Sequence, residues 1–324
     1  MSFSLPKSCA LVACLGEALI DRLGPPGDDS ANAGPVEDRL GGAPANVACG
    51  LARLGTEVAF LGRLGQDAIG EEFAALFQQR GVEVGGLQWD DQRPSRIVLV
   101  RRRINGERQF QGFAGDRGLG FADQALTPVL LPKEARWLLV GSLPLASSPS
   151  AESLQDAAAQ ARAHGIALAM DVNWRPTFWN SRADPASGPN HRAMELIRPL
   201  LEQAALIKLA REEALWFFSS EDPAVISAAL PQRPDVVVTD GAAPVRWCLE
   251  DQAGVQQAFQ PPRVVDTTGA GDAFTAGLLH RWTAAPAERV RFAAACGALV
   301  CSGAGGIDPQ PTEAHVERFL GGVS

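Results

Sequence analysis

The chain has 324 residues and a mass of 34.2 kDa, which allows one large domain or a large domain with a small appendage. Hydrophobic residues make up 46% and charged residues 20%, as in an ordinary globular protein. The net charge of −8 comes with no block of basic residues, which argues against nucleic acid or an anionic membrane surface as a partner. Any phosphate site must therefore be local, built from a few side chains and backbone N–H groups.

The N-terminal segment contains no recognisable targeting sequence. Residues 1–8 run directly into an apolar, strand-like segment, Cys9–Leu15, and are too short for the separate regions of a signal peptide. No apolar run reaches the length that spans a membrane. The six cysteines and four histidines have no metal-ligand spacing, so the cysteines are expected to be free thiols in a reducing compartment. These features predict a cytoplasmic protein.

Further along the chain, apolar strand-like runs alternate with helical patterns, among them 150–164 and 191–203. Buried strands are predicted at Arg136–Gly141, Ile166–Val172, Ala205–Leu209 and Asp235–Thr239. Because continuous apolar strands that alternate with helices are typical of a parallel sheet covered on both faces, the sequence predicts the α/β class. A ligand site then belongs at the carboxyl ends of the strands. The loop-rich stretches 24–34 and 181–190 are expected at the surface.

Residues 95–113 break this alternation. Two strand-like runs flank Asn105-Gly106, a dipeptide that strongly favours a hairpin turn. An antiparallel pair is therefore expected beside the α/β core, either as a lid over a pocket or as an ordinary edge hairpin. The arginines at 101–103 fit both, and because neighbouring residues of a strand face opposite ways, solvated edge charge is the simpler interpretation.

The most specific motif is the string Asp266–Phe274, which follows a short apolar run and precedes a helical pattern. Gly269 and Gly271 allow a tight turn with exposed N–H groups, and the start of a helix adds unpaired N–H groups and a positive dipole end. Such an arrangement can hold a phosphoryl group in transfer. Asp272, at its mouth, would be the general base for a hydroxyl group; the alternative is a simple helix N-cap.

Two further motifs contribute polar groups. Gly41–Gly55 begins with small residues that open a helix, and Asn46 lies in its first turns, where an amide can bind a sugar hydroxyl. Close helix packing is the alternative for this motif. Residues 16–21 place Asp21 just after the first strand, where a carboxylate can bind two hydroxyls. The sequence contains no P-loop, no dinucleotide-binding fingerprint and no protein-kinase catalytic loop.

Together these motifs resemble those of the ribokinase-like, or pfkB, family of carbohydrate kinases. Gly41–Gly55 resembles its N-terminal signature and Asp266–Phe274 its C-terminal signature; residues 16–21, 41–46 and 171–179 resemble the fructokinase branch. The resemblance implies a three-layer α/β sandwich, with a mostly parallel central sheet between helices and a small antiparallel β lid. Residues 1–324 would form one domain, with the lid built from about 17–40 and 92–118.

The resemblance also implies a role for each matching residue. The implied catalytic groups are the base Asp272, the anion hole of Gly269, Ala270 and Gly271, and Arg175. The implied substrate contacts are Asp21, Gly41, Gly42, Asn46, Asn173 and Asp272. The implied nucleotide contacts are Lys208, Thr239, Gly241, Gly269 and Gly271. Glu213 would organise Mg²⁺ through water, and Asp266 and Thr268 would hold a monovalent cation.

Two positions depart from the family pattern. Ala210 stands where the motif that ends in Glu213 has Asn or a small polar residue, and Pro244 replaces a glycine common in the nucleotide loop. Neither change removes a group that does chemistry, but both bear on metal and nucleotide binding.

The implied activity is transfer of a phosphoryl group from ATP to fructose, with Mg²⁺ bridging the nucleotide phosphates and K⁺ as an activator. The lid is expected to exclude water and to form the interface of a homodimer. Alternative acceptors are 2-keto-3-deoxygluconate, ribose or a nucleoside. A catalytically silent interaction protein is an alternative of a different class, and the presence of Gly269, Gly271 and Asp272 argues against it. Neither nucleic acid nor a membrane is expected as a partner.

Overall fold

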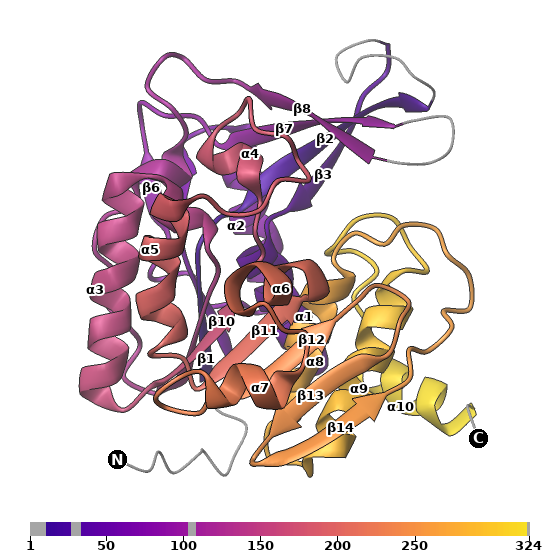
Figure 1. Ribbon diagram of the computed structural model, residues 1–324. Coiled ribbons are helices and arrows are strands. Elements are labelled where there is room, and N and C mark those ends of the chain that lie inside the picture. Colours follow the sequence, from indigo (N-terminus) through magenta and orange to yellow (C-terminus); the bar gives the residue numbers. More distant parts are fainter. Residues whose placement is uncertain (1–10, 27–33, 103–107, 323–324) are drawn as a thin grey trace.

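The computed structural model describes residues 11–26, 34–102 and 108–322 (Figure 1). At its centre lies an eight-stranded sheet, sheet A, in the order β14-β13-β12-β11-β10-β9-β1-β4. Its strands are β1 (Leu11–Leu15), β4 (Val58–Leu61), β9 (Ala135–Val140), β10 (Ala167–Asp171), β11 (Leu206–Ala210), β12 (Asp235–Thr239), β13 (Val245–Leu249) and β14 (Gln252–Gln256). Neighbours pair in parallel except at β12–β13 and β13–β14. The predicted buried strands correspond to β9–β12, so the mostly parallel sheet is confirmed.

Helices cover both faces of sheet A (Figure 1). One layer contains α1 (Ala43–Leu54), α2 (Ala68–Arg80), α8 (Ala270–His280), α9 (Pro286–Val300) and α10 (Glu313–Gly322). The other contains α3 (Ser148–His164), α5 (His191–Leu201), α6 (Arg211–Phe218) and α7 (Pro223–Ala228). Because side chains alternate along a strand, Val12 and Cys14 of β1 face the first layer, and Ala13 and Leu15 face the second. Two apolar cores result, and they confirm the three-layer sandwich.

The local sequence accounts for the limits of the helices that position the site. Pro44 stands in the first turn of α1, where its missing N–H costs no hydrogen bond, and Gly55 ends the helix in the left-handed conformation with a φ of 99°. Asp67 caps α2, because its side chain accepts a hydrogen bond from the Gly70 N–H. The sequence therefore fixes where α1 begins, and with it the place of Asn46.

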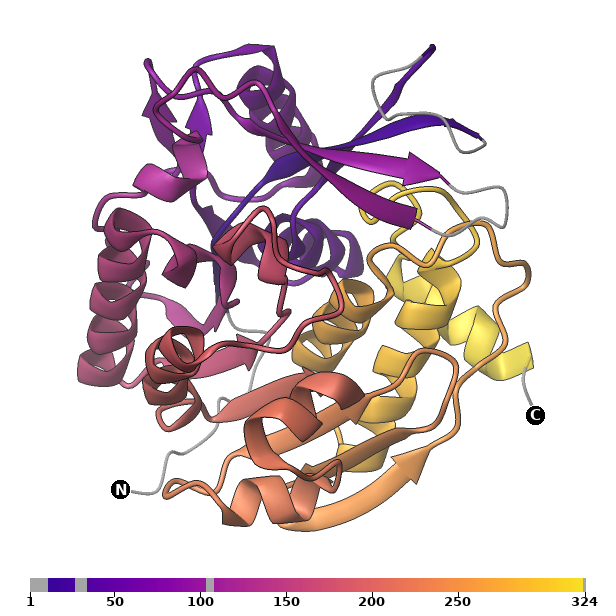
Figure 2. The ribbon, with the colours of Figure 1, turned by 45° about the horizontal axis from the view of Figure 1, so that its top comes forward.

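A second sheet, sheet B, has the order β3-β2-β7-β8 and lies at one end of the α/β body (Figures 1 and 2). Its strands are β2 (Leu19–Pro26), β3 (Glu37–Gly41), β7 (Arg96–Arg102) and β8 (Arg108–Ala114). The outer pairs β2–β3 and β7–β8 are antiparallel, as expected for hairpins, while the central pair β2–β7 is parallel. The prediction that a surface loop begins at residue 24 was wrong, because pairing with β7 extends β2 to Pro26. The predicted Asn105-Gly106 turn lies outside the described residues.

The remaining strands are short, and β5 (Arg63–Gly65) pairs in parallel with β6 (Gln88–Asp90). Within the described ranges, the structure contains no helix with the length and apolar character needed to span a lipid bilayer. The cysteines at positions 14, 49, 248, 296 and 301 are free thiols, as predicted.

Candidate active site

A cleft of about 530 Å³ opens where sheet B faces the carboxyl ends of β10 and β11 and the start of α8. Most of the predicted site residues line it: Asp21, Gly42, Asn46, Asn173, Arg175, Lys208, Thr268, Gly269, Ala270, Gly271 and Asp272. The predicted residues that do not line this cleft are Gly41, Glu213, Thr239, Gly241 and Asp266. Segments far apart in the sequence thus meet at the edge of the sheet where a ligand was expected.

The turn before α8 has the geometry of an anion-binding site. Gly269 caps the helix with a φ of 78°, and a side-chain carbon at this position would lie only 2.5 Å from the Gly306 Cα. Only glycine therefore fits this turn. The first turn of α8 offers N–H groups without partners inside the helix, together with the positive end of the helix dipole. The Ala270 N–H itself donates to the Thr267 carbonyl at 3.2 Å.

Asp272 lies inside the first turn of α8 and points into the cleft. Because Gly269 is the cap and makes no side-chain cap bond, the alternative that Asp272 only caps the helix is wrong. Asn46 Nδ2 donates to Asp272 Oδ2 at 2.7 Å, which joins the two motifs that the sequence singled out. Burial raises the pKa of Asp272 to about 6; the charge of Asp171 adds to this, and the Asn46 hydrogen bond and the Lys208 charge oppose it. A carboxylate with this pKa can accept a proton near neutral pH.

The loop after β10 carries Asn173 and Arg175 to the cleft. Asn173 has a φ of 44°, in the left-handed region that Asn tolerates better than most residues. Glu213 holds this loop, because its Oε1 accepts the Trp174 N–H at 2.6 Å while its Oε2 accepts the Ala210 N–H at 2.7 Å. Ala210 has no side-chain oxygen that could cap α6, so only the reverse half of a capping box is present, in which Glu213 accepts the Ala210 N–H. Both oxygens of Glu213 are thus engaged by backbone N–H groups.

Asp266 closes the turn that precedes the anion site. Its Oδ1 accepts the N–H and the hydroxyl of Thr268 at 3.0 and 2.8 Å, and its Oδ2 accepts the Gly305 N–H at 2.8 Å. No group of three or more His, Cys, Asp or Glu side chains that could hold a metal ion occurs in the described part of the chain.

Three buried ionisable residues at the site had no role in the sequence analysis. The first is Asp171, which ends β10 and accepts hydrogen bonds from Lys208 Nζ and Thr275 Oγ1, both at 3.0 Å. A signal for it existed, because it opens the 171–179 motif. The others, Glu17 and Arg96, lie at the junction with sheet B.

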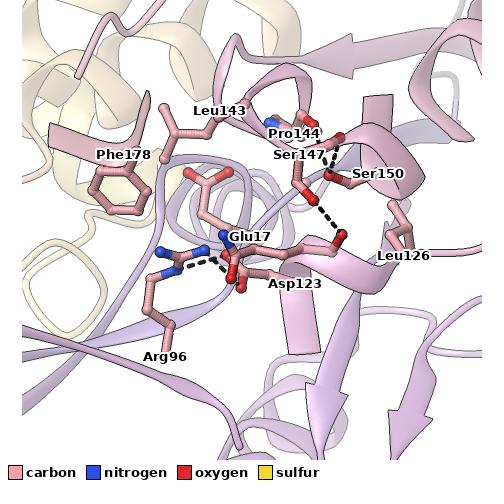
Figure 3. A pocket seen from close by; sticks show the side chains of 12 residues that line it. Glu17, Arg96, Asp123, Leu126, Leu143, Pro144, Ser147, Ser150 and Phe178 are labelled. Carbon is pink, nitrogen blue, oxygen red and sulfur yellow. Dashed lines mark hydrogen bonds and ion pairs between the residues drawn. The ribbon is translucent and has the colours of Figure 1, made fainter. Parts of the chain in front are cut away.

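Glu17 lies in the wall between the cleft and a small internal cavity with about 10 Å³ of room, roughly enough for one water molecule (Figure 3). Its Oε1 accepts the Ala43 N–H at 3.1 Å, at the beginning of the helix that carries Asn46. Burial raises the pKa of Glu17 to about 8, so this carboxyl group carries a proton at neutral pH. Glu17 therefore positions α1 as an uncharged group.

Arg96, at the start of β7, joins sheet B to the body of the molecule. Its Nε and Nη2 donate to both carboxylate oxygens of Asp123 at 2.9 and 3.0 Å (Figure 3). Its guanidinium carbon also lies within 4.9 Å of the ring centres of Phe113, Phe121 and Phe178. Asp123 belongs to η1 (Ala122–Ala125), and Phe178 to α4 (Pro176–Trp179), which directly follows the loop of Arg175. Sheet B is thereby linked to that loop.

The fold and the position of the cleft are those of ribokinase-like small-molecule kinases. The chain belongs to the pfkB family of carbohydrate kinases, which matches residues 10–313. It is 33% identical to the fructokinase of Salmonella typhimurium, over 95% of this chain and 99% of that protein. The predicted family and fold class are therefore confirmed.

Solved structures give the same result. The fructokinase of Xylella fastidiosa with bound ATP matches 97% of this chain and 98% of its own, with 28% sequence identity and a TM-score of 0.78. The fructokinase of Vibrio cholerae, solved with fructose, ADP and a calcium ion, matches 96% of this chain and 99% of its own, with 27% identity and a TM-score of 0.79.

Proposed function

We propose that this carbohydrate kinase is an ATP-dependent fructokinase that phosphorylates the 6-hydroxyl of D-fructose. The observation that carries the proposal is the hydrogen bond between Asn46 and Asp272, 2.7 Å long, at the edge of a cleft that also contains Lys208 and Arg175. In this proposal Asp272 is the base and Asn46 the hydroxyl-binding amide, and the cations Lys208 and Arg175 line the same cleft. The fructokinases to which this chain is similar support fructose as the acceptor.

The proposed mechanism is a direct in-line transfer. Asp272 takes the proton of the sugar hydroxyl while the hydroxyl oxygen forms a bond to the terminal phosphorus of ATP. At the same time the bond between that phosphorus and the bridging oxygen breaks, and ADP leaves with that oxygen. The N–H groups at Gly269–Gly271 stabilise the charge on the transferring oxygens, with help from Lys208 and Arg175. The roles given to these residues rest on their position around the cleft.

The sugar would lie between polar and apolar walls. Asp21, Asn46 and Asn173 offer groups that bind hydroxyls, and Gly42 lets the backbone approach closely, with Gly41 beside it. On the side of sheet B, the cleft is lined by the apolar residues Leu19, Val98, Val100 and Phe110. A wall of this kind suits the C–H face of a sugar ring. We propose that sheet B, with flanking residues from about 17–40 and 92–118, is the lid of a single domain that excludes water.

The remaining assignments are also proposals. Mg²⁺, held by the phosphate oxygens of the nucleotide, would neutralise charge during transfer. A water-mediated contact from Glu213 would have to use oxygens that already accept backbone N–H groups. Thr239 and Gly241, at the carboxyl end of β12, would bind the nucleotide beyond the cleft. Asp266 and Thr268 would hold the turn around K⁺. A cytoplasmic location and a homodimer formed through the lid complete the proposal.

The decisive experiment is ADP release measured with fructose, ribose, 2-keto-3-deoxygluconate and a nucleoside as acceptors. Fructose should give the highest kcat/KM, because a site that binds a hydroxyl rejects analogues that lack it by large factors. Phosphorus NMR of the product should place the phosphate on the 6-hydroxyl. The matched control is Asp272→Asn, which measures ADP release by any contaminating ATPase. A higher kcat/KM for another acceptor would overturn fructose and leave the kinase assignment intact.

A further inference from the structure

A buried ion pair lies beside the anion site. Asp171 is the last residue of β10, and its register partner in β11 is Lys208. Lys208 Nζ lies 3.0 Å from Asp171 Oδ1, and only 8% and 4% of the two residues, respectively, is exposed. Burial, the largest single effect, lowers the pKa of Lys208, but the charges of Asp171, Glu213 and Asp272 and the hydrogen bond to Asp171 together outweigh it, so that the pKa is raised and the ammonium group stays charged.

Asp171 has a second partner on the helix that carries the base. Its Oδ2 accepts a hydrogen bond of 3.0 Å from the hydroxyl of Thr275, which lies about one turn after Asp272 in α8. Thr275 is 1% exposed, so this contact is shielded from water. One carboxylate thus connects the central sheet with α8, and its two oxygens have separate tasks.

The other end of the pair reaches the anion site. Lys208 lines the cleft, and a side-chain carbon built on Gly271 would lie 3.0 Å from its Nζ. The ammonium group therefore lies beside Gly271, in the turn that lines the cleft. A lysine stem is flexible, with several rotatable bonds, so a lysine without a fixed partner would occupy many positions. The Asp171 carboxylate removes that freedom.

We propose that Asp171 is a positioning residue for phosphoryl transfer: it fixes the Lys208 ammonium group against the Gly269–Gly271 turn and ties it to the helix of Asp272. This proposal rests on the proposed kinase function of the cleft. Asp171 does not line the cleft; it acts through Lys208 and, by its charge, on the base. Removing the charge of Asp171 should make Asp272 easier to ionise, because a negative neighbour favours the protonated form.

The test is Asp171→Asn, which keeps the volume and an oxygen that can accept from Lys208 but removes the charge. We expect kcat to fall on the order of 10²-fold, the effect of a catalytic group misplaced by about 1 Å. The acid limb of kcat/KM should move to lower pH. In a Lys208→Met background the same substitution should change kcat by less than about threefold, because Asp171 then has no lysine to position.

A matched control separates this role from simple stabilisation. Asp90→Asn removes another buried carboxylate, which accepts from Arg63 at 2.9 Å outside the cleft, and should lower the melting temperature without changing the pH profile. If Asp171→Asn behaved like this control, with kcat and pH profile unchanged, the proposal would be overturned. Equal losses of kcat in the wild-type and Lys208→Met backgrounds would overturn it as well.

A binding measurement keeps the test independent of the acceptor. Calorimetry without sugar should find that Asp171→Asn weakens a non-hydrolysable ATP analogue about tenfold more than ADP, because a charge-assisted contact to the terminal phosphate is lost. If the wild type phosphorylated no sugar, the proposed function would fail, and this comparison would still decide where Lys208 points. Equal weakening of both nucleotides would overturn the placement of Lys208.

Discussion

The pKa of Asp272 makes the strongest prediction for this enzyme. A base works only when it is ionised, so activity should be lost as the pH falls through its pKa. Burial moves that pKa from its ordinary value of 3.8 to about 6. At pH 5 about a tenth of the molecules would carry the ionised base, and at pH 7 about nine tenths. The value of kcat/KM for the sugar at pH 5 should therefore be about a tenth of its plateau.

The matching substitution is Asp272→Asn. In the wild type, Asn46 donates to Asp272 at 2.7 Å. The amide of the variant keeps the size of the side chain and an oxygen that can accept this hydrogen bond, but it cannot take a proton. We expect kcat to fall by roughly 10²–10⁴-fold. The KM for ATP should change much less, because the nucleotide phosphates keep their contacts with the backbone. The residual activity should lose its dependence on pH between 5 and 7.

The assay is ADP release at saturating ATP and constant ionic strength, with single-turnover experiments that isolate the chemical step. Circular dichroism of the variant controls for folding. A wild-type profile that stays flat from pH 5 to 7 would refute the raised pKa. A single-turnover rate for Asp272→Asn within about tenfold of the wild type would refute the base itself.

Other predictions follow from the same contacts. Arg96→Met should lower the free energy of unfolding by about 3 kcal/mol, the lower end of the range for a broken buried pair, because it leaves the partly buried Asp123 carboxylate without its partner; a loss below about 1 kcal/mol in urea titrations would contradict this. Gly269→Ala should reduce kcat on the order of 10²-fold, since the new methyl group would meet the Gly306 Cα at 2.5 Å and displace the turn; an unchanged kcat would argue against it. Potassium should raise activity above that in tetramethylammonium at equal ionic strength, since Asp266 closes the turn beside the anion site. Equal rates would remove that idea.

The sequence predicted the parts of the fold whose signal is local. The run Asp235–Thr239 has an uninterrupted apolar centre, which only a strand covered on both faces needs, and it coincides with β12. The two antiparallel strands beyond β12 were not predicted. β13 (Val245–Leu249) alternates between buried and half-buried residues, and β14 (Gln252–Gln256), at the edge of the sheet, is largely exposed. Both strands form because each pairs with its neighbour and so extends the sheet from β12. The residue pattern of a short segment does not reveal such pairing.

The candidate site divides in the same way. Gly269, Asn46 and Asp272 stand in strings whose residue types and spacing already indicate chemistry, and the structure brings them together. Arg96 could not be predicted, because a charged residue in a strand-like run normally faces solvent. It is buried only because one carboxylate and three aromatic rings from separate segments surround it. The pairing of Asp171 with Lys208 likewise depends on two strands becoming neighbours.

The contacts of Arg96 affect how sheet B can bend, because they anchor the sheet at one end. The anchored end contains Arg96 and its register partner Leu19, and the opposite end, or tip, is where β2 and β7 end. When a sheet anchored at one end bends, the displacement of its residues grows with their distance from the anchored end. Any bending of sheet B around a sugar would therefore move Phe110 and Val100, nearer the tip, further than Asp21. The apolar side chains of sheet B would therefore move toward the sugar ring, while the carboxylate of Asp21 would move little.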